Sequence, residues 1–254
     1  MYKGIGLSFT CLLFYLQSFA QDALTLQESG TDLNVLYHNE MTGGIVVHSR
    51  GFGLNLRRGK HVNGVARRFI EYELISMKDL KQTKTYNGNY PDSKGFNYGQ
   101  LNSVLVLRVG AGYQKVLFGK AERERKSVEI RYSIFVGPSL ALAKPVYLEV
   151  LDTAAASTSS TVTQKYNPAV DNLSNIASKA PYLTGIGETK IYPGAYAKFG
   201  LSFEYADKHN YVRAIETGMA IDAYPQTVPI MANAYNKPYF FTLYLNFIFG
   251  RRWF

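Results

Sequence analysis

Long stretches in which apolar and polar residues alternate limit what this chain can fold into. Near the C-terminus, Phe241, Leu243 and Leu245 alternate with Thr242 and Tyr244, which is the period of a β-strand with one continuous apolar face. Most segments of this kind are ten or more residues long, close to the roughly 9–11 residues that cross a bilayer as a tilted strand. The pattern predicts eight strands, at about 43–58, 64–78, 99–110, 127–143, 146–155, 192–206, 210–223 and 238–250.

The two faces of these strands differ in a way that favours a membrane barrel. One face is almost entirely Leu, Ile, Val, Phe and Tyr, whereas the other mixes Gly, Ser and Ala with isolated charges. Transmembrane barrels place apolar residues outward and polar residues inward, and their closed ring pairs every backbone group. We therefore expect an all-β, antiparallel, up-and-down transmembrane barrel of eight strands, or ten if an extra hairpin lies within 79–98.

The N-terminal segment predicts export. One cation, Lys3, precedes an apolar run that ends near Phe19, and Ser18 and Ala20 suit a signal peptidase. Residues 1–20 are the expected signal peptide, residues 21–42 a periplasmic segment, an extra strand or a lumen plug, and residues 43–254 the barrel. Cleavage removes Cys11, the single cysteine, and lowers the net charge from +9 to +8 because Lys3 leaves as well.

A signal peptide, alternating strands and a terminal Phe254 together resemble the small outer-membrane β-barrel proteins of Gram-negative bacteria, the OmpX-like class. The resemblance covers about 43–254. It implies an outer-membrane location and a C-terminal signal for the barrel-assembly machinery. That signal would consist of Phe247, Phe249, Trp253 and Phe254. Phe254 has the opposite parity to Phe249, so either a bulge or turn at Gly250 restores the register or "RRWF" extends past the last strand.

Charged residues on the inward face suggest a filled lumen. An eight-stranded barrel has an interior just wide enough for side chains, and an unpaired buried charge is costly. A mutually paired network is therefore expected in place of an ion path or general pore. Its predicted members are Arg57, Glu71, Glu73, Arg108, Glu129, Arg131, Glu149, Lys198, Glu204, Glu216 and Asp222.

Basic residues also gather near the expected outer rim. If the first strand runs outward from the periplasm, the inner turns are 79–98, 144–145 and 207–209, and the outer loops are 59–63, 111–126, 156–191 and 224–237, with a short helix in 168–180. Contact with lipopolysaccharide phosphates is one hypothesis for the basic residues, because Arg binds phosphate well. A solvated rim is the other. The candidates are Arg58, Lys60, Arg67, Arg68, Lys120, Arg123, Arg125 and Lys126.

Few features suggest catalysis. The four histidines, His38, His48, His61 and His209, show no metal-ligand spacing, so neither a metal nor a cofactor is expected. The leading hypothesis is a non-enzymatic outer-membrane protein that acts through its loops and rims, as an accessory subunit of a secretion or assembly complex or as an envelope stabiliser. Its expected partners are outer-membrane lipids and envelope proteins, not nucleic acid. The alternatives are a narrow transport barrel and a lipid-modifying enzyme.

Overall fold

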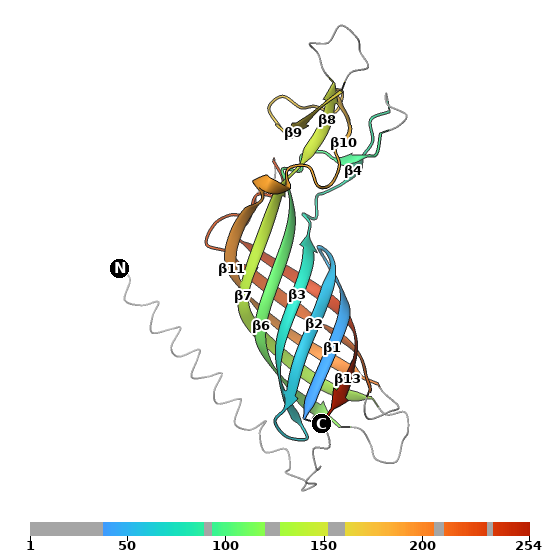
Figure 1. The fold of residues 1–254 in the computed structure, drawn as a ribbon, viewed down its shortest axis with the longest axis vertical. Coiled ribbons are helices and arrows are strands. Elements are labelled where there is room, and N and C mark those ends of the chain that lie inside the picture. The colour runs from blue at the N-terminus through green and yellow to red at the C-terminus, as the bar shows by residue number, and fades with distance from the viewer. Residues whose placement is uncertain (1–37, 89–92, 120–127, 152–160, 206–210, 233–235) are drawn as a thin grey trace, which may run out of the picture. The chain divides into compact units, whose positions relative to one another are not determined.

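The fold is a closed antiparallel barrel of eight strands (Figure 1). The structure is a computed structural model that describes residues 38–88, 93–119, 128–151, 161–205, 211–232 and 236–254, so the expected signal peptide and most of 21–42 lie outside the described residues. The first and last strands pair with each other and close the ring, which confirms the predicted fold class. The barrel strands are β1 (Asn39–His48), β2 (Gly51–His61), β3 (Ala66–Met77), β6 (Asn102–Phe118), β7 (Glu129–Pro145), β11 (Lys190–Glu204), β12 (Tyr211–Ala223) and β13 (Tyr239–Trp253).

The outer wall of the barrel is apolar. Ile45, Phe52 and Leu54 are 55–61% exposed, and large apolar side chains on the other strands also point outward. An apolar wall of this kind is stable in lipid, where no water has to cover it. Among the described residues, no helix is long and apolar enough to cross a membrane.

The two ends of the barrel differ in their connections. At the end where β1 begins and β13 stops, here called the terminal end, the strands are joined by 62–65, 119–128 and 205–210. At the opposite loop end, they are joined by Ser49–Arg50, 78–101, 146–189 and 224–238. The predicted assignment of inner and outer connections is therefore wrong: the described parts of 79–98 lie at the same end as those of the two long loops, and 59–63 and the described part of 111–126 lie at the terminal end.

The first predicted strand, 43–58, is a hairpin. β1 and β2 pair with each other across a turn at Ser49–Arg50. Glycine is required just after this turn: Gly51 has a φ of +152°, and a Cβ there would lie 2.3 Å from the Ser76 backbone oxygen. The outward apolar residues change from odd positions such as Val47 to even positions such as Phe52. That change of parity marks the turn.

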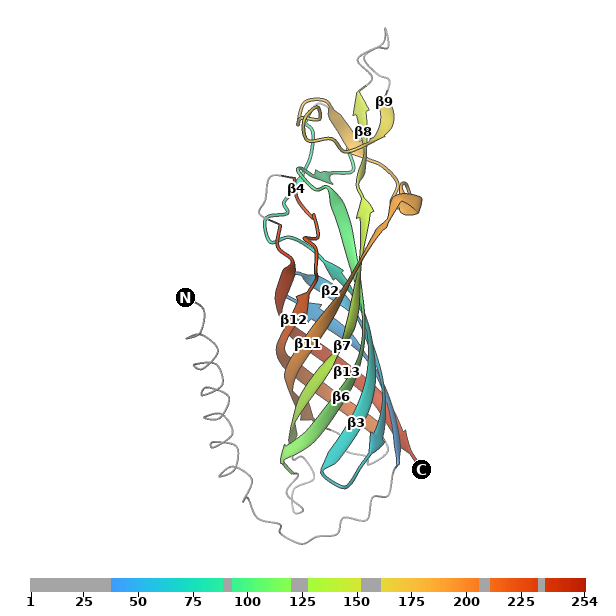
Figure 2. The same ribbon diagram turned by 90° about the vertical axis from the view of Figure 1, so that its left-hand side faces the viewer.

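The predicted strand 146–155 is not part of the barrel. Its described residues form β8 (Tyr147–Leu151), the central strand of a separate sheet with β9 (Thr161–Lys165) and β10 (Ile176–Lys179) at the loop end (Figure 2). The apolar face of β8 packs into a small core with Phe96 and Tyr166 instead of facing lipid. The predicted strand 43–58 is two barrel strands, and the predicted strand 146–155 is none. The two errors cancel, so the predicted number of eight barrel strands is correct.

Three connections fold together at the loop end, and we call them the loop domain. The connection 78–101 contributes the short hairpin β4 (Lys84–Thr85) and β5 (Phe96–Asn97), which is the extra hairpin but lies outside the barrel. Its Asn87 donates to the backbone oxygens of Leu173 and Ile176 at 3.1 and 2.8 Å. From the third connection, the Ala232 backbone N–H donates to the Gly99 oxygen at 2.8 Å.

The helix predicted in 168–180 is absent, and the residues form turns that lead into β10. Short polar side chains explain this. The Asp171 carboxylate accepts the Asn167 backbone N–H at 2.7 Å, and the Asn172 side-chain oxygen accepts the backbone N–H groups of Ser174 and Asn175. Such bonds compete with helical hydrogen bonds. A single-turn 3₁₀ helix, η1 (Ile186–Glu188), follows and precedes β11.

One ionic contact in the loop domain predicts a response to pH. The Glu188 carboxylate accepts hydrogen bonds from Lys165 Nζ at 2.9 Å and Tyr147 Oη at 2.5 Å, and these bonds lower the pKa of Glu188 below its ordinary 4.5. A lowered folded-state pKa means that the contact stabilises the loop domain above the ordinary value and is lost as the pH falls through the folded value. Amide exchange of 161–189, corrected for its intrinsic pH dependence, should therefore be faster at pH 3 than at pH 7.

The Glu188→Gln variant gives the matched comparison. It should show the faster exchange already at pH 7 and a smaller change between the two pH values. A variant with the same pH response as the unaltered protein would show that other carboxyl groups control this segment.

Candidate functional site

A dense ionic network lies inside the middle of the barrel. Arg57 donates from Nε to Glu71 at 2.6 Å and from both terminal nitrogens to Glu216 at 2.8 and 2.7 Å. The second pair is a bidentate fork, which is the strongest geometry for Arg and a carboxylate. Both carboxyl groups have no exposed surface. A single guanidinium therefore joins the β3 and β12 strands across the lumen.

Two further cations complete this central network. Arg108 donates to Asp222 at 2.9 and 2.5 Å and to Glu73 at 2.9 Å. Lys198 donates to Glu71 at 3.1 Å and also contacts Glu73. The neutral groups Tyr244, Ser133 and Asn55 add hydrogen bonds to these carboxylates. Seven of the eleven predicted lumen residues meet here: Arg57, Glu71, Glu73, Arg108, Lys198, Glu216 and Asp222.

A second network fills the terminal end of the lumen. Arg252 donates to Glu40 at 2.9 Å and to Glu204 at 2.6 Å, and Arg67 pairs with the same two carboxylates at 2.9 and 3.4 Å. Lipid contact and a solvated rim were the two hypotheses for Arg67, and both are wrong for this residue, because residue 67 has the inward parity of Glu71 and its side chain is buried. The sequence reasoning missed Glu40 and Arg252. Both lie beyond the predicted strand ends, and extension of the alternation would have found them.

Arg131 joins this second network through Glu129 and through Glu204, 3.7 Å from its Nε. His61 Nε2 lies 3.3 Å from Glu40. The eleventh predicted residue, Glu149, belongs to β8 in the loop domain, so its assignment to the lumen is wrong. The strand that contains Glu149, β8, follows β7 almost directly in the sequence, so alternation alone could not distinguish the two strands.

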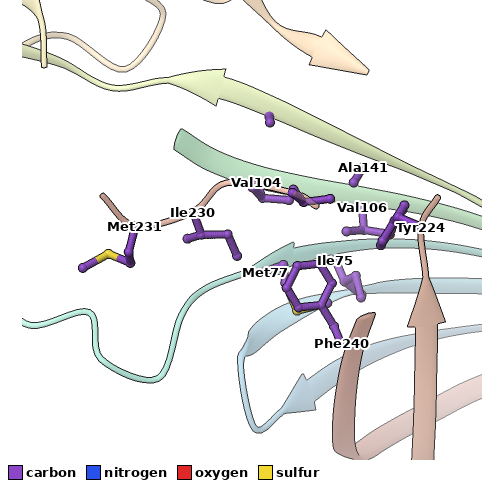
Figure 3. Packing of buried hydrophobic residues seen from close by; sticks show 11 residues of the cluster. Ile75, Met77, Val104, Val106, Ala141, Tyr224, Ile230, Met231 and Phe240 are labelled. Carbon is purple, nitrogen blue, oxygen red and sulfur yellow. The ribbon is translucent and has the colours of Figure 1, made fainter. Parts of the chain in front are cut away.

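The loop end of the lumen is closed by apolar side chains. Ile75, Met77, Val106 and Phe240 from the barrel strands pack against residues of the connection 224–238, as Figure 3 shows. Those residues are Tyr224, Val228, Ile230 and Met231, all buried. The described part of the connection therefore packs an apolar plug against the barrel strands at this end.

The three layers leave the barrel with a solid interior. An apolar plug, a central ionic network and a terminal-end network follow one another along the axis. Phe69 and Phe135 pack between the two networks, with the Arg57 guanidinium 4.6 Å from the Phe135 ring centroid. Charges buried this way act as structural cross-links between strands. In the part of the chain that the structure describes, no group of three or more His, Cys, Asp or Glu side chains could hold a metal ion.

Three of the remaining candidates for lipid contact lie at the terminal end, not on an outer rim with the long loops. Arg58, Lys60 and Arg68 point outward from β2 and β3 and are exposed. Lys120, Arg123, Arg125 and Lys126 lie outside the described residues.

The last strand has no interruption. β13 pairs with β1 in continuous register from Tyr244 to Trp253, so Gly250 carries no bulge and "RRW" belongs to the strand. Neither predicted alternative is therefore correct. Phe247, Phe249 and Trp253 share the outward face, and Phe254 follows the strand and is exposed. Recognition of these four residues by the assembly machinery stays a prediction.

The central network predicts a strong asymmetry between two neighbouring arginines. Arg57→Met leaves Glu71 and Glu216 without their main partner, so the free energy of unfolding should fall by about 3–5 kcal/mol. Arg58→Met is the matched control, because Arg58 faces outward, and its effect should stay below about 1 kcal/mol. Urea unfolding of the purified barrel, followed by circular dichroism, measures both. Equal losses would contradict the assignment of Arg57 to a buried network.

The apolar plug predicts a barrel that stays closed when the plug is loosened. Ile230→Ala removes a buried side chain and should destabilise the folded state by about 2–5 kcal/mol. Planar-bilayer recordings should nevertheless show no steady conductance, for the unaltered protein or for this variant, because the central network lies beneath the plug. Single-channel currents from the unaltered protein would overturn the filled-lumen account.

The comparisons with known proteins find similarity to solved structures alone. No protein-family model matches the chain, and no curated protein matches its sequence. The chain is similar to the crystal structure of Neisserial surface protein A, with 9% identity, 85% of this chain and 97% of that chain covered, and a TM-score of 0.41. It is also similar to Ail, the attachment invasion locus protein of Yersinia pestis, with 7% identity, 85% and 99% covered, and a TM-score of 0.38.

Proposed function

We propose that this protein is a non-enzymatic, integral outer-membrane protein in which the barrel is an anchor and the loop domain binds a partner. One observation carries this proposal: three connections that are far apart in the sequence fold together at one end of the barrel on a core of their own. That core contains Phe96, Val146, Leu148, Val150, Tyr166 and Ile176, with Leu101 and Ala232 packed against it. A barrel that had only a structural role in the membrane would not need a separately folded loop domain.

The contrast between the two barrel ends supports the proposed orientation. Outer-membrane barrels have short periplasmic turns and longer extracellular loops. On this rule the loop domain faces the exterior, and the start of β1 and the end of β13 face the periplasm. The export signal expected in residues 1–20 and the apolar outer wall agree with an outer-membrane location.

The filled lumen argues against the transport alternative. Arg57, Lys198 and Arg108 each pair with a carboxylate on a non-adjacent strand of the barrel, and a solute would have to break several buried ion pairs to pass. Removal of one partner from such a buried pair lowers the free energy of unfolding by about 3–5 kcal/mol. Binding at the exposed ends is therefore the function that this geometry favours.

Exposed apolar residues make a protein partner the best candidate for the loop domain. Val170 and Leu173 lie in the turn that precedes β10 and are 63% and 48% exposed. Apolar side chains that are exposed close together on a folded surface often mark a protein-binding site. An accessory subunit of an envelope secretion or assembly complex fits this description.

A second role, contact with lipopolysaccharide, has an observation of its own. At the loop end, Lys78 lies 6.0 Å from the Phe52 ring centroid, and Lys237 lies 5.4 Å from that of Tyr239. Cations above aromatic rings at a membrane surface are well placed for lipid phosphates. This contact would make the protein a stabiliser of the outer leaflet.

Co-purification tests the main proposal. The protein is extracted from membranes in mild detergent, and any protein that migrates with it in stoichiometric amount is identified. A Val170→Asp/Leu173→Asp variant should reduce that partner at least tenfold, since it places two charges on the apolar surface. Thr163→Asp, which adds a charge to exposed β9 in the same domain, should retain it.

Two results would contradict the proposal. One is recovery of the unaltered barrel without any stoichiometric partner. The other is an unchanged amount of partner with the double variant, provided that both variants migrate as folded barrels in unheated gels.

A further inference from the structure

Charges are sorted by sign between the two sides of the barrel wall. On the eight barrel strands, every acidic side chain has the inward parity: Glu40, Glu71, Glu73, Glu129, Glu204, Glu216 and Asp222. The outward-facing charges on the same strands are all basic. Except for Lys144 at the loop end, they all lie near the terminal end: Arg58, Lys60, Arg68, Lys115, Arg213 and Arg251. The lipid-facing wall at this end therefore carries a net positive charge that no strand neighbour offsets.

Three of these cations lie together on adjacent strands. The sheet register places Arg58 in a lateral row with Ile70, Ala111 and Val136 on β2, β3, β6 and β7. The next row towards the terminal end contains Lys60, Arg68, Tyr113 and Ile134. Figure 1 shows these four strands side by side. Two arginines and a lysine thus border an apolar surface that continues towards the membrane centre.

A groove runs between these two rows. Ala111 is small, whereas its cross-strand neighbours Ile70 and Val136 are large, and together they leave a depression in the outer wall. The depression has a volume of about 970 Å³ and is bordered by Arg58, Lys60 and Arg68 along one side. Most of the residues that line the depression are apolar, and the three cations lie along one edge of it.

The cations lack a counter-charge of their own. Lys60 and Arg68 are direct cross-strand partners, and like charges in that position destabilise a sheet. In the described part of the chain, neither residue has an ion pair or a side-chain hydrogen bond, and the same is true of Arg58. Three clustered cations at a lipid-facing position, with no acidic side chain paired to them among the described residues, favour an anion from the membrane.

We propose that this groove binds an anionic phospholipid of the leaflet at the terminal end. The two guanidinium groups and Lys60 hold the phosphate, and one acyl chain lies over Ala111 between Ile70 and Val136. The inference rests on the membrane placement proposed above, which puts the terminal end at the periplasm. The ligand is therefore a phospholipid of the inner leaflet and not lipopolysaccharide, which differs from the contact predicted for these residues from the sequence.

The test is lipid binding to the purified, full-length barrel, measured by native mass spectrometry in detergent. The probes are phosphatidylglycerol, phosphatidylcholine and lipopolysaccharide. The unaltered protein should bind phosphatidylglycerol at least tenfold more tightly than phosphatidylcholine. Arg58→Gln/Arg68→Gln should weaken that binding at least tenfold, and Ala111→Phe should weaken it by filling the groove.

Arg213→Gln is the matched control. Arg213 faces outward near the same end but on β12, away from the groove, so this variant should bind phosphatidylglycerol normally. Each variant is first shown to be folded by its mobility in unheated gels.

Three outcomes would overturn the proposal. They are unchanged phosphatidylglycerol binding in the double variant, tighter binding of lipopolysaccharide than of phosphatidylglycerol, and complete competition by inorganic phosphate at the same concentration as the lipid. None of these measurements involves the loop domain, so the partner-binding proposal stands or fails separately.

Discussion

Arg57, which pairs with both Glu71 and Glu216, shows the constraint on which the rest of the structure depends. An eight-stranded ring leaves an interior that side chains must fill, and charges placed there must pair because they have lost water. Arg57 does this across the lumen, with bonds of 2.6–2.8 Å to two strands. The outer wall is then free to be apolar, and the barrel is stabilised by its centre as well as by its backbone ladder.

A barrel with a solid interior can act only at its ends and on its wall. At the loop end, an apolar plug around Ile230 and Phe240 closes the mouth, and a loop domain with its own core lies beyond it. At the terminal end, the second network holds Glu40 and Glu204 inside while Arg58 and Arg68 face lipid. The inward placement of the acids follows from the same constraint, because buried carboxylates need the cations of the lumen, whereas the outward bases are the basis of the proposed phospholipid site.

Alternation revealed the fold class and ten of the eleven predicted lumen charges, because a period of two assigns each side chain to a face without any knowledge of its partners. Composition did not reveal the turn between Val47 and Phe52. The change of the outward residues from odd to even positions is the signal that marks it. It also could not separate β8, whose Val146, Leu148 and Val150 alternate like lipid-facing residues but pack against Phe96. Three-dimensional pairing, such as that of Arg252 with Glu40, depends on closure of the ring and lies beyond any single segment.

The central claim is that side chains fill the lumen, and the reactivity of a thiol inside it tests this most directly. Ser133 lies in the middle of the barrel with no exposed surface, 3.2 Å from Glu216, and cysteine is close to serine in size. In a Cys11→Ser background, a Ser133→Cys barrel should resist a small charged thiol reagent while folded and react fully after unfolding in urea. Rapid labelling of the folded barrel would show that water and solutes enter the lumen and would contradict the account.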